Sequence, residues 1–159
     1  MHENQKLINE FYAAFQRKDF QTMQKAYASS ANFTDPVFQN LNAEQTKAMW
    51  EMLCKRAQDL DVQFQNVQAD EYNGSADWEA TYTFSSTGRK VVNRIHAEFV
   101  FERGKIVQHV DDFNFHSWSK QAFGLTGLVI GWTPFFRAKV RSTVMKSLGR
   151  FMEKEEAKA

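Results

Sequence analysis

The chain has 159 residues, of which 43% are apolar, so it is long enough for one domain with a buried core and too apolar for disorder. Its formal charge of +1 creates no overall field, and no nucleic-acid partner is expected. The polar N-terminus has no apolar signal region, which favours the cytoplasm, and the longest mostly apolar run, residues 122–136, is too short and too interrupted by Gly for a membrane span. The single Cys54 cannot form an internal disulfide and is expected to serve packing.

The first part of the chain predicts three helices and one short strand. Apolar residues recur at helical spacing from about residue 4 to 17, and a second helix is expected to follow Asp19 as its N-cap and to carry Tyr27 on its inner side. Ala31–Pro36 is predicted to be a short strand that the proline ends. Asn42 precedes a third helix and begins the sequence pattern of a capping box.

From Asp61 onward apolar side chains recur at every second position, which predicts four antiparallel strands. The parity changes between Phe64 and Val67, so a bulge that curves the sheet is expected there. Asn73-Gly74 is the strongest short hairpin signal and predicts the first turn. Helices collected against one face of a curved antiparallel sheet make the fold class α+β.

The last two strands, residues 90–102 and 105–115, are joined at a turn that contains Gly104. We expect a domain of residues 1–116 and a separate helical extension of residues 117–159. Thr133-Pro134 is a good helix start, and the helix after it has an apolar stripe opposite a row of Lys and Arg. This helix is expected to pack on its own domain or on a dimer mate. A lid over the domain and contact with an anionic membrane surface are the alternatives.

The turn before the last strand decides which way His109 points, because a slip of one residue exchanges the two faces of a strand. A two-residue turn at Arg103-Gly104 requires a positive φ at Arg103, which is unfavourable for a residue with a long side chain. A type I turn centred on Glu102-Arg103 and followed by a bulge at a left-handed Gly104 requires a positive φ only at the glycine. The second register is therefore predicted. It pairs Ala97 with His109, Ile95 with Asp111 and Arg94 with Asp112.

In this register His109 and Asp111 project onto the aromatic, helix-covered side of the sheet, while Asp112 faces solvent. An unpaired carboxylate is costly in an apolar interior, so Asp111 must be hydrogen-bonded, shifted in pKa or in contact with water in a cavity. His109 lies two residues away on the same face, so the two form a candidate acid–base pair. A satisfied structural contact is the alternative. A register shifted by one would instead resemble a metal site made of His96, Glu98, His109 and Asp111, but no tight ligand spacing supports it and no metal is expected.

Two segments carry a resemblance to a known family: DFQTMQKAYASSANFTDPVF, Asp19 to Phe38, and FERGKIVQHVDDF, Phe101 to Phe113. With the order of elements over residues 4–116, they resemble the nuclear transport factor 2-like fold, and in particular bacterial ketosteroid isomerases and SnoaL-like polyketide cyclases. The resemblance implies a cone-shaped domain whose mouth admits a small, largely apolar molecule. The extension from His116 is similar to a tail in a bacterial subgroup of this fold. We expect a homodimer and no cofactor.

The resemblance also assigns roles by position. Asp35 falls where the isomerases keep the carboxylate that shuttles a proton, although Asp-Pro is also a common turn starter. Phe11 and Ala97 fall where the isomerases keep the tyrosine and the protonated acid that donate hydrogen bonds to an oxyanion. Both donors are missing, and Tyr12, one position along, is turned about 100° around the helix. Steroid isomerisation is therefore not expected.

His109 and Asp111 fall on the last strand, where the cyclases and many SnoaL-like proteins place an acid–base residue. With Asp35 they are the candidate catalytic residues. Aromatic residues at such spacing can also be simple core. The candidate ligand-binding residues are Phe11, Tyr12, Trp50, Trp78, Tyr82, Asn93, Ala97 and Phe113.

We therefore expect a small enzyme for acid–base chemistry, such as isomerisation, cyclisation, dehydration or epoxide opening, on a modest apolar substrate. Asp35 would accept the proton, and His109 and Asp111 would act as a positioned pair. The alternative is a non-catalytic binding or assembly module whose basic tail engages a partner or a membrane surface. Convergence of the three residues around a solvent-connected void favours the enzyme, and a cone filled with aromatic side chains favours the module.

Overall fold

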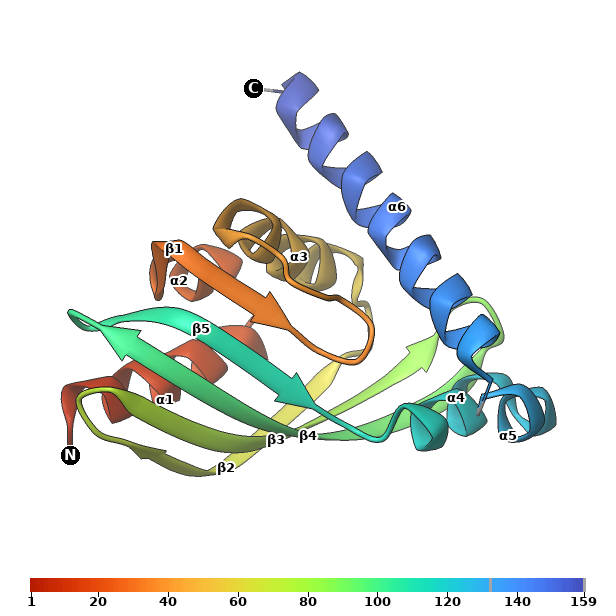
Figure 1. The fold of residues 1–159 in the computed structure, drawn as a ribbon, viewed down its shortest axis with the longest axis horizontal. Coiled ribbons are helices and arrows are strands. Elements are labelled where there is room, and N and C mark those ends of the chain that lie inside the picture. Colours follow the sequence, from red (N-terminus) through yellow and green to blue (C-terminus); the bar gives the residue numbers. More distant parts are fainter. Residues whose placement is uncertain (132, 159) are drawn as a thin grey trace.

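The computed structural model describes residues 1–131 and 133–158. Five strands form one curved, open sheet in the order β1-β5-β4-β3-β2, and the predicted α+β fold class is confirmed (Figure 1). The helices are α1 (Glu3–Gln16), α2 (Phe20–Lys25), α3 (Ala43–Arg56), α4 (Phe115–Phe123), α5 (Leu125–Ile130) and α6 (Pro134–Lys158). The strands are β1 (Tyr27–Thr34), β2 (Asp61–Ala69), β3 (Asn73–Phe84), β4 (Arg89–Glu102) and β5 (Lys105–Asp112).

The N-terminal helices begin where the sequence predicts. Asp19 caps α2 by accepting a hydrogen bond from the backbone N–H of Thr22, and Asn42 opens α3 with a complete capping box. However, α2 ends at Lys25, so the prediction that Tyr27 belongs to this helix is wrong. Tyr27 starts β1, which is longer than predicted because it pairs with Ile106 of β5. Such a long-range pairing overrides the local helical pattern.

β1 lies at the edge of the sheet and runs parallel to β5, whereas all other neighbours pair antiparallel. In this parallel pair Phe33 lies beside His109 and Thr34 beside Val110. The next residues of the two chains, Asp35 and Asp111, therefore leave the pair at the same end.

The bulge in β2 is as predicted, whereas the turn of the first hairpin differs from the prediction. The predicted bulge in β2 is confirmed, because the register shifts between Gln65 and Gln68. The hairpin turn is not centred on Asn73-Gly74, since Asp70 closes a turn over residues 70–73 by accepting the N–H of Asn73 at 2.8 Å. Gly74 lies in β3 instead, and a Cβ added there would be 2.8 Å from side-chain atoms of the core. Glycine is needed at this position for close packing, not for the turn.

The turn between β4 and β5 also differs from the prediction. Glu102 pairs with Lys105, and both Arg103 (φ 52°) and Gly104 (φ 75°) are left-handed, so the two-residue turn forms despite the long side chain of Arg103. A bulge follows at once and leaves Val107 without a partner in β4. Because the bulge restores the parity, the faces are as predicted although the pairing is displaced by two residues. Phe99 lies across from His109, Ala97 from Asp111 and His96 from Asp112.

The two faces of β4 and β5 are chemically distinct. His109 and Asp111 are 0% and 4% exposed on the helix-covered face, whereas Asp112 is exposed. The predicted pair of Arg94 with Asp112 is wrong, because the displaced register places His96 across from Asp112, and Arg94 pairs instead with Glu79 of β3 at 3.0 Å. His96 and Glu98 lie on the exposed face, so the metal-like cluster does not form, and within residues 1–131 and 133–158 no three His, Cys, Asp or Glu are arranged to hold a metal ion.

The C-terminal helices start directly after the sheet. Asn114 caps α4. α4, α5 and the first turns of α6 gather at one corner of the molecule, and α6 then runs past α3 to the end of the chain (Figure 1). Leu148 and Phe151 of α6 are buried in the core cluster, and Lys55 of α3 forms an ion pair with Glu155 at 3.3 Å. None of the helices in the described part of the chain is long and apolar enough to cross a membrane.

Candidate functional site

A pocket of about 800 Å³ lies on the helix-covered side of the sheet. This volume is within the usual range for small-molecule sites. Strands β1, β3, β4 and β5 contribute to its lining, together with α3, α4 and α6. Among the predicted site residues, those that line it are Asp35, Trp50, Trp78, Tyr82, Asn93, Asp111 and Phe113.

Three predicted ligand-binding residues are not part of this lining and lie in the core behind it. Phe11, Tyr12 and Ala97 are each at most 1% exposed. Phe11 packs edge-on against the ring of His109, with centroids 5.9 Å apart. The hydroxyl of Tyr12 is buried with no hydrogen-bond partner among the described residues, and burial raises the pKa of Tyr12 well above its ordinary value. Tyr12 is therefore a packing residue that keeps its proton.

A chain of four hydrogen-bonded side chains supports the floor of the pocket. Trp50 Nε1 donates to Tyr27 Oη at 2.8 Å, Tyr27 Oη lies 2.7 Å from His109 Nδ1, and His109 Nε2 lies 2.8 Å from Asp111 Oδ1. Since Tyr27 already accepts the tryptophan N–H, its own proton is available for His109 Nδ1. This order leaves the imidazole proton on Nε2, from where it is donated to Asp111. We call these four residues the relay.

The relay holds Asp111 at the pocket and keeps His109 out of it. His109 is fully buried and does not line the pocket, whereas Asp111 does. Burial raises the pKa of Tyr27 well above its ordinary value, so its hydroxyl remains a donor at neutral pH. The sequence-based analysis missed Tyr27, because its position opposite His109 depends on the parallel pairing of β1 with β5.

Asp35 is the second carboxyl group of the pocket. Its Oδ1 accepts the backbone N–H groups of Val37 at 2.7 Å and Phe38 at 2.6 Å. Burial, and to a smaller extent the neighbouring Asp111, raises the pKa of Asp35 from an ordinary 3.8 to about 7, against the lowering effects of these two hydrogen bonds and of Arg141. A group with a pKa near 7 is present in both protonation states at neutral pH, which suits it to take up and release protons.

Two further groups on pocket-lining residues can donate hydrogen bonds. Trp78 has a buried Nε1–H without a partner among the described residues. Asn93 contributes a half-buried side-chain amide from the inner face of β4. Donors in such positions can stabilise negative charge that develops on a substrate oxygen. Neither of them lies at the two positions where the resemblance places oxyanion donors, which this chain fills with Phe11 and Ala97.

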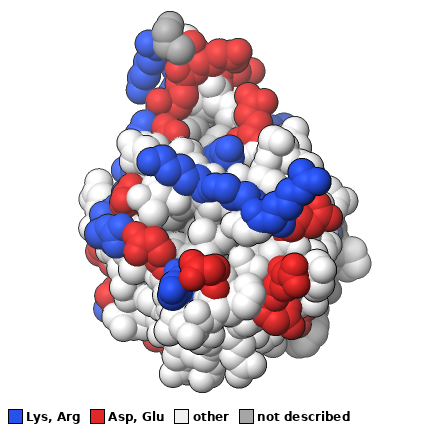
Figure 2. All heavy atoms as spheres, turned by 90° about the vertical axis from the view of Figure 1, so that its left-hand side faces the viewer, with Lys and Arg blue, Asp and Glu red and all other residues white. Residues whose placement is uncertain are grey.

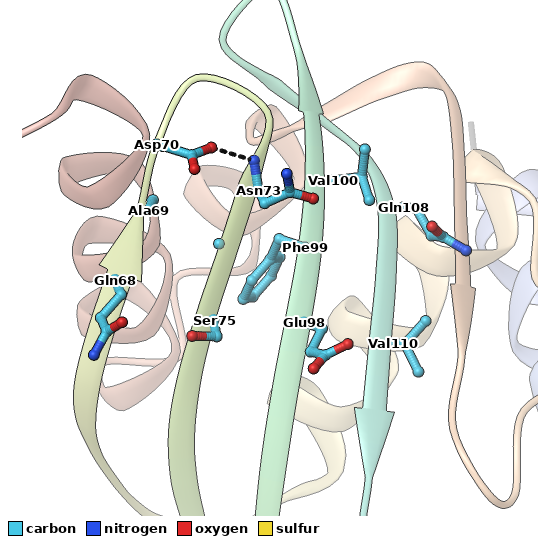
Figure 3. A pocket seen from close by; sticks show the side chains of 11 residues that line it. Gln68, Ala69, Asp70, Asn73, Ser75, Glu98, Phe99, Val100, Gln108 and Val110 are labelled. Carbon is cyan, nitrogen blue, oxygen red and sulfur yellow. Dashed lines mark hydrogen bonds between the residues drawn. The ribbon is translucent and has the colours of Figure 1, made fainter.

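A second depression, of about 520 Å³, lies on the face of the sheet that points away from the helices (Figure 3). Gln68, Ser75, Glu98, Gln108 and Val110 line it. Its other carboxyl group, on Asp70, is occupied by the backbone of the β2–β3 turn. Among the residues that line this depression no hydrogen-bonded acid–base pair is present.

Residues 8–109 match the family model of the SnoaL-like domain. The chain belongs to the SnoaL-like family. This assignment confirms the resemblance seen in the sequence and extends over most of the sheet and the helices that cover it. No protein of curated function matches this SnoaL-like chain.

Solved structures similar to this SnoaL-like protein share its fold at low sequence identity. An NTF2-like protein of unknown function from Burkholderia pseudomallei has a TM-score of 0.68 and 17% identity, over 78% of this chain and 100% of that chain. An LEH-like epoxide hydrolase from M. tuberculosis has a TM-score of 0.63 and 19% identity, over 83% and 96%. IdmH from Streptomyces antibioticus, described as a proposed polyketide cyclase, has a TM-score of 0.63 and 18% identity, over 76% and 98%. At these identities the likeness shows the fold alone.

Proposed function

We propose that this SnoaL-like protein is a small enzyme that transfers protons on a modest, largely apolar substrate, in an isomerisation, cyclisation, dehydration or epoxide opening. One observation carries the proposal: Asp35 and Asp111 line the same pocket and are held in different ways. Asp111 has the relay behind it, whereas Asp35 has two backbone N–H groups and a pKa of about 7. Two carboxyl groups whose surroundings differ in this manner are suited to separate acid and base roles.

The roles follow from these surroundings. The carboxylate of Asp35 removes a proton from the substrate and, as the carboxylic acid, returns a proton to another atom. Asp111, oriented by His109, accepts a hydrogen bond from a substrate hydroxyl or from an attacking water. Asn93 and Trp78 donate hydrogen bonds to an oxygen that gains charge during the reaction. The apolar walls of the pocket match a substrate with few polar groups.

Mass spectrometry and turnover assays test the proposal together. Native mass spectra of the purified full chain show whether a small molecule is bound and give the oligomeric state, expected to be a homodimer. The protein is then incubated with a panel of epoxides, β,γ-unsaturated ketones and β-hydroxy ketones, and products are followed by chromatography with mass detection. We expect turnover of at least one class, with kcat/KM that rises through about pH 7 as Asp35 loses its proton.

Three Asp→Asn variants provide the decisive comparison. Asp35→Asn and Asp111→Asn are each expected to lower kcat by about 10²-fold to 10⁴-fold, the usual contribution of a positioned acid or base. Asp112→Asn is the matched control, because Asp112 follows Asp111 in the chain but faces solvent. Turnover that survives Asp35→Asn, or that falls equally in Asp112→Asn, would remove Asp35 from the reaction.

A further inference from the structure

The charges of this chain are divided unequally along its length. Residues 1–112 contain 12 Lys or Arg and 16 Asp or Glu, a formal charge of −4, whereas residues 113–152 contain six Lys or Arg and no Asp or Glu. The overall charge of +1 therefore conceals an acidic domain followed by a basic segment of 40 residues. An asymmetry of this kind points to an anionic partner for one end of the chain.

The six cations of this segment have no ion-pair partner in the described structure, although Arg141 lies close enough to Asp35 to lower the pKa of that carboxyl group. None of them forms an ion pair with a carboxylate of residues 1–131 or 133–158. Arg137 stacks on the ring of Phe115 at 5.2 Å, and Arg141 donates to the backbone oxygen of Pro36 at 3.0 Å. The other four are exposed: Lys120, Lys139, Lys146 and Arg150.

Two large apolar side chains are exposed in the same segment. Leu125, at the start of α5, is 81% exposed, and Phe135, at the start of α6, is 79% exposed. Phe136, the next residue, packs on Phe123 with ring centroids 5.5 Å apart and so fixes the start of α6 against α4. Consecutive residues of a helix project about 100° apart, so this contact directs Phe135 away from α4. Both exposed side chains belong to the corner where α4, α5 and α6 meet (Figure 1).

We propose that this corner, named here the basic corner and consisting of Leu125, Phe135, Lys120, Arg137 and Lys139, docks on the surface of an anionic lipid bilayer. Leu and Phe side chains enter the boundary between headgroups and acyl chains, while neighbouring cations attract acidic headgroups. A nucleic acid would satisfy the cations but leave both apolar side chains in water. The side of the molecule away from α4 and α5 carries Lys and Arg beside Asp and Glu (Figure 2).

Docking in this orientation has a consequence for the pocket. Trp118 of α4 and Val144 and Ser147 of α6 line it, so the helices of the basic corner also form part of the pocket wall. A bilayer held at this corner lies near a largely apolar cavity, and an apolar ligand could pass between them with little exposure to water. The docking itself does not depend on the proposed reaction, so each can fail without the other.

Vesicle binding by the full chain tests the proposal. The protein is mixed with phosphatidylcholine vesicles that contain or lack phosphatidylglycerol, in low and in high salt, and the bound fraction is measured by flotation. We expect binding to the anionic vesicles that high salt weakens, because salt screens exposed charges. The double variant Leu125→Glu/Phe135→Glu should lower the partition coefficient at least about tenfold, and Lys139→Glu at least about fivefold, as expected for one lost cation near the surface.

Tyr72→Glu is the matched control. Tyr72 is 62% exposed but lies in the β2–β3 turn, so its replacement should leave vesicle binding unchanged. Equal binding to neutral and anionic vesicles, no binding to either, or full binding by the double variant would overturn the proposal. If the double variant binds vesicles like the wild type but changes the sedimentation coefficient of the free protein, the basic corner is instead a contact with a second copy of the chain. The replaced side chains are exposed, so far-UV circular dichroism should confirm that every variant is folded.

Discussion

The stability of Asp35→Asn at different pH values distinguishes a catalytic carboxyl group from one that only stabilises a turn. Burial raises the pKa of Asp35 from 3.8 to about 7, so between these pH values the folded protein holds a proton that the unfolded chain has released. Because the unfolded chain binds fewer protons in this window, the stability of the wild type falls as pH rises, by about 1.4 kcal/mol per pH unit. Over about three units the loss approaches about 4 kcal/mol, and it is complete above the folded pKa.

Asn carries no charge and escapes this loss, while its Oδ1 can still accept the N–H groups of Val37 and Phe38. We therefore expect Asp35→Asn to be more stable than the wild type by roughly 2–4 kcal/mol at about pH 8, and nearly equal to it at about pH 4. Urea unfolding at about pH 4, 6 and 8 measures the difference through the midpoints and slopes. Asp112→Asn, on the exposed face, should stay within about 0.5 kcal/mol of the wild type throughout.

The opposite result would refute this reasoning. A variant less stable than the wild type at high pH, or a difference that does not change with pH, would mean that the ionised carboxylate stabilises its turn and that Asp35 is structural. A variant that gains stability while losing turnover would show the trade-off expected of a strained functional group.

Three further substitutions test the packing around the site, each by urea unfolding. Tyr27→Phe removes the hydroxyl at the centre of the relay and leaves two buried polar partners unsatisfied, so it should lower the free energy of unfolding by about 2–4 kcal/mol. The control Tyr82→Phe removes one hydrogen bond at a half-buried position and should lower it by less than half as much. Gly74→Ala places a methyl group 2.8 Å from core side chains and should destabilise by about 1–3 kcal/mol, whereas Gly149→Ala in α6, with no atom within 4 Å, should stabilise by about 1 kcal/mol. Arg103→Gly relieves a left-handed φ of 52° and should stabilise by about 0.5–1 kcal/mol, and an unchanged midpoint would mean that this turn stores no strain.

The faces of the strands were predictable from the sequence, but their pairing was not. His109 and Asp111 were predicted inside and Asp112 outside from the expected register of the turn at Gly104, and these faces are as predicted although the turn differs. The turn prediction failed since local sterics disfavour a left-handed Arg103, and the sheet accepts that local cost. The bulge at Val107 then returned the strand to the predicted parity. Two different combinations of turn and bulge therefore give the same faces, and the turn sequence alone did not determine the pairing.

Only part of the candidate site could be predicted from the sequence, because the rest depends on long-range pairing and packing. Asp111 was predicted from its position on the last strand and Asp35 from the resemblance to the isomerases, and both line the pocket. Tyr27 was not predicted, because a Tyr at the end of a helical pattern gives no sign that a strand starts there and meets His109 across a parallel pair. The contribution of α6 to the pocket, through Val144 and Ser147, likewise depends on docking that no local pattern encodes.

The parallel pairing of β1 with β5 also explains why two carboxyl groups in one pocket can differ in behaviour. Parallel neighbours leave the sheet at the same end, so Asp35 and Asp111 face one cavity, and the charge of Asp111 disfavours charge on Asp35. The relay gives Asp111 a donor from within the core, while Asp35 accepts two backbone N–H groups, lies near Arg141 and has a pKa of about 7. Since the relay begins at Trp50 in α3 and passes through β1, the asymmetry between the two groups depends on the whole helix–sheet contact.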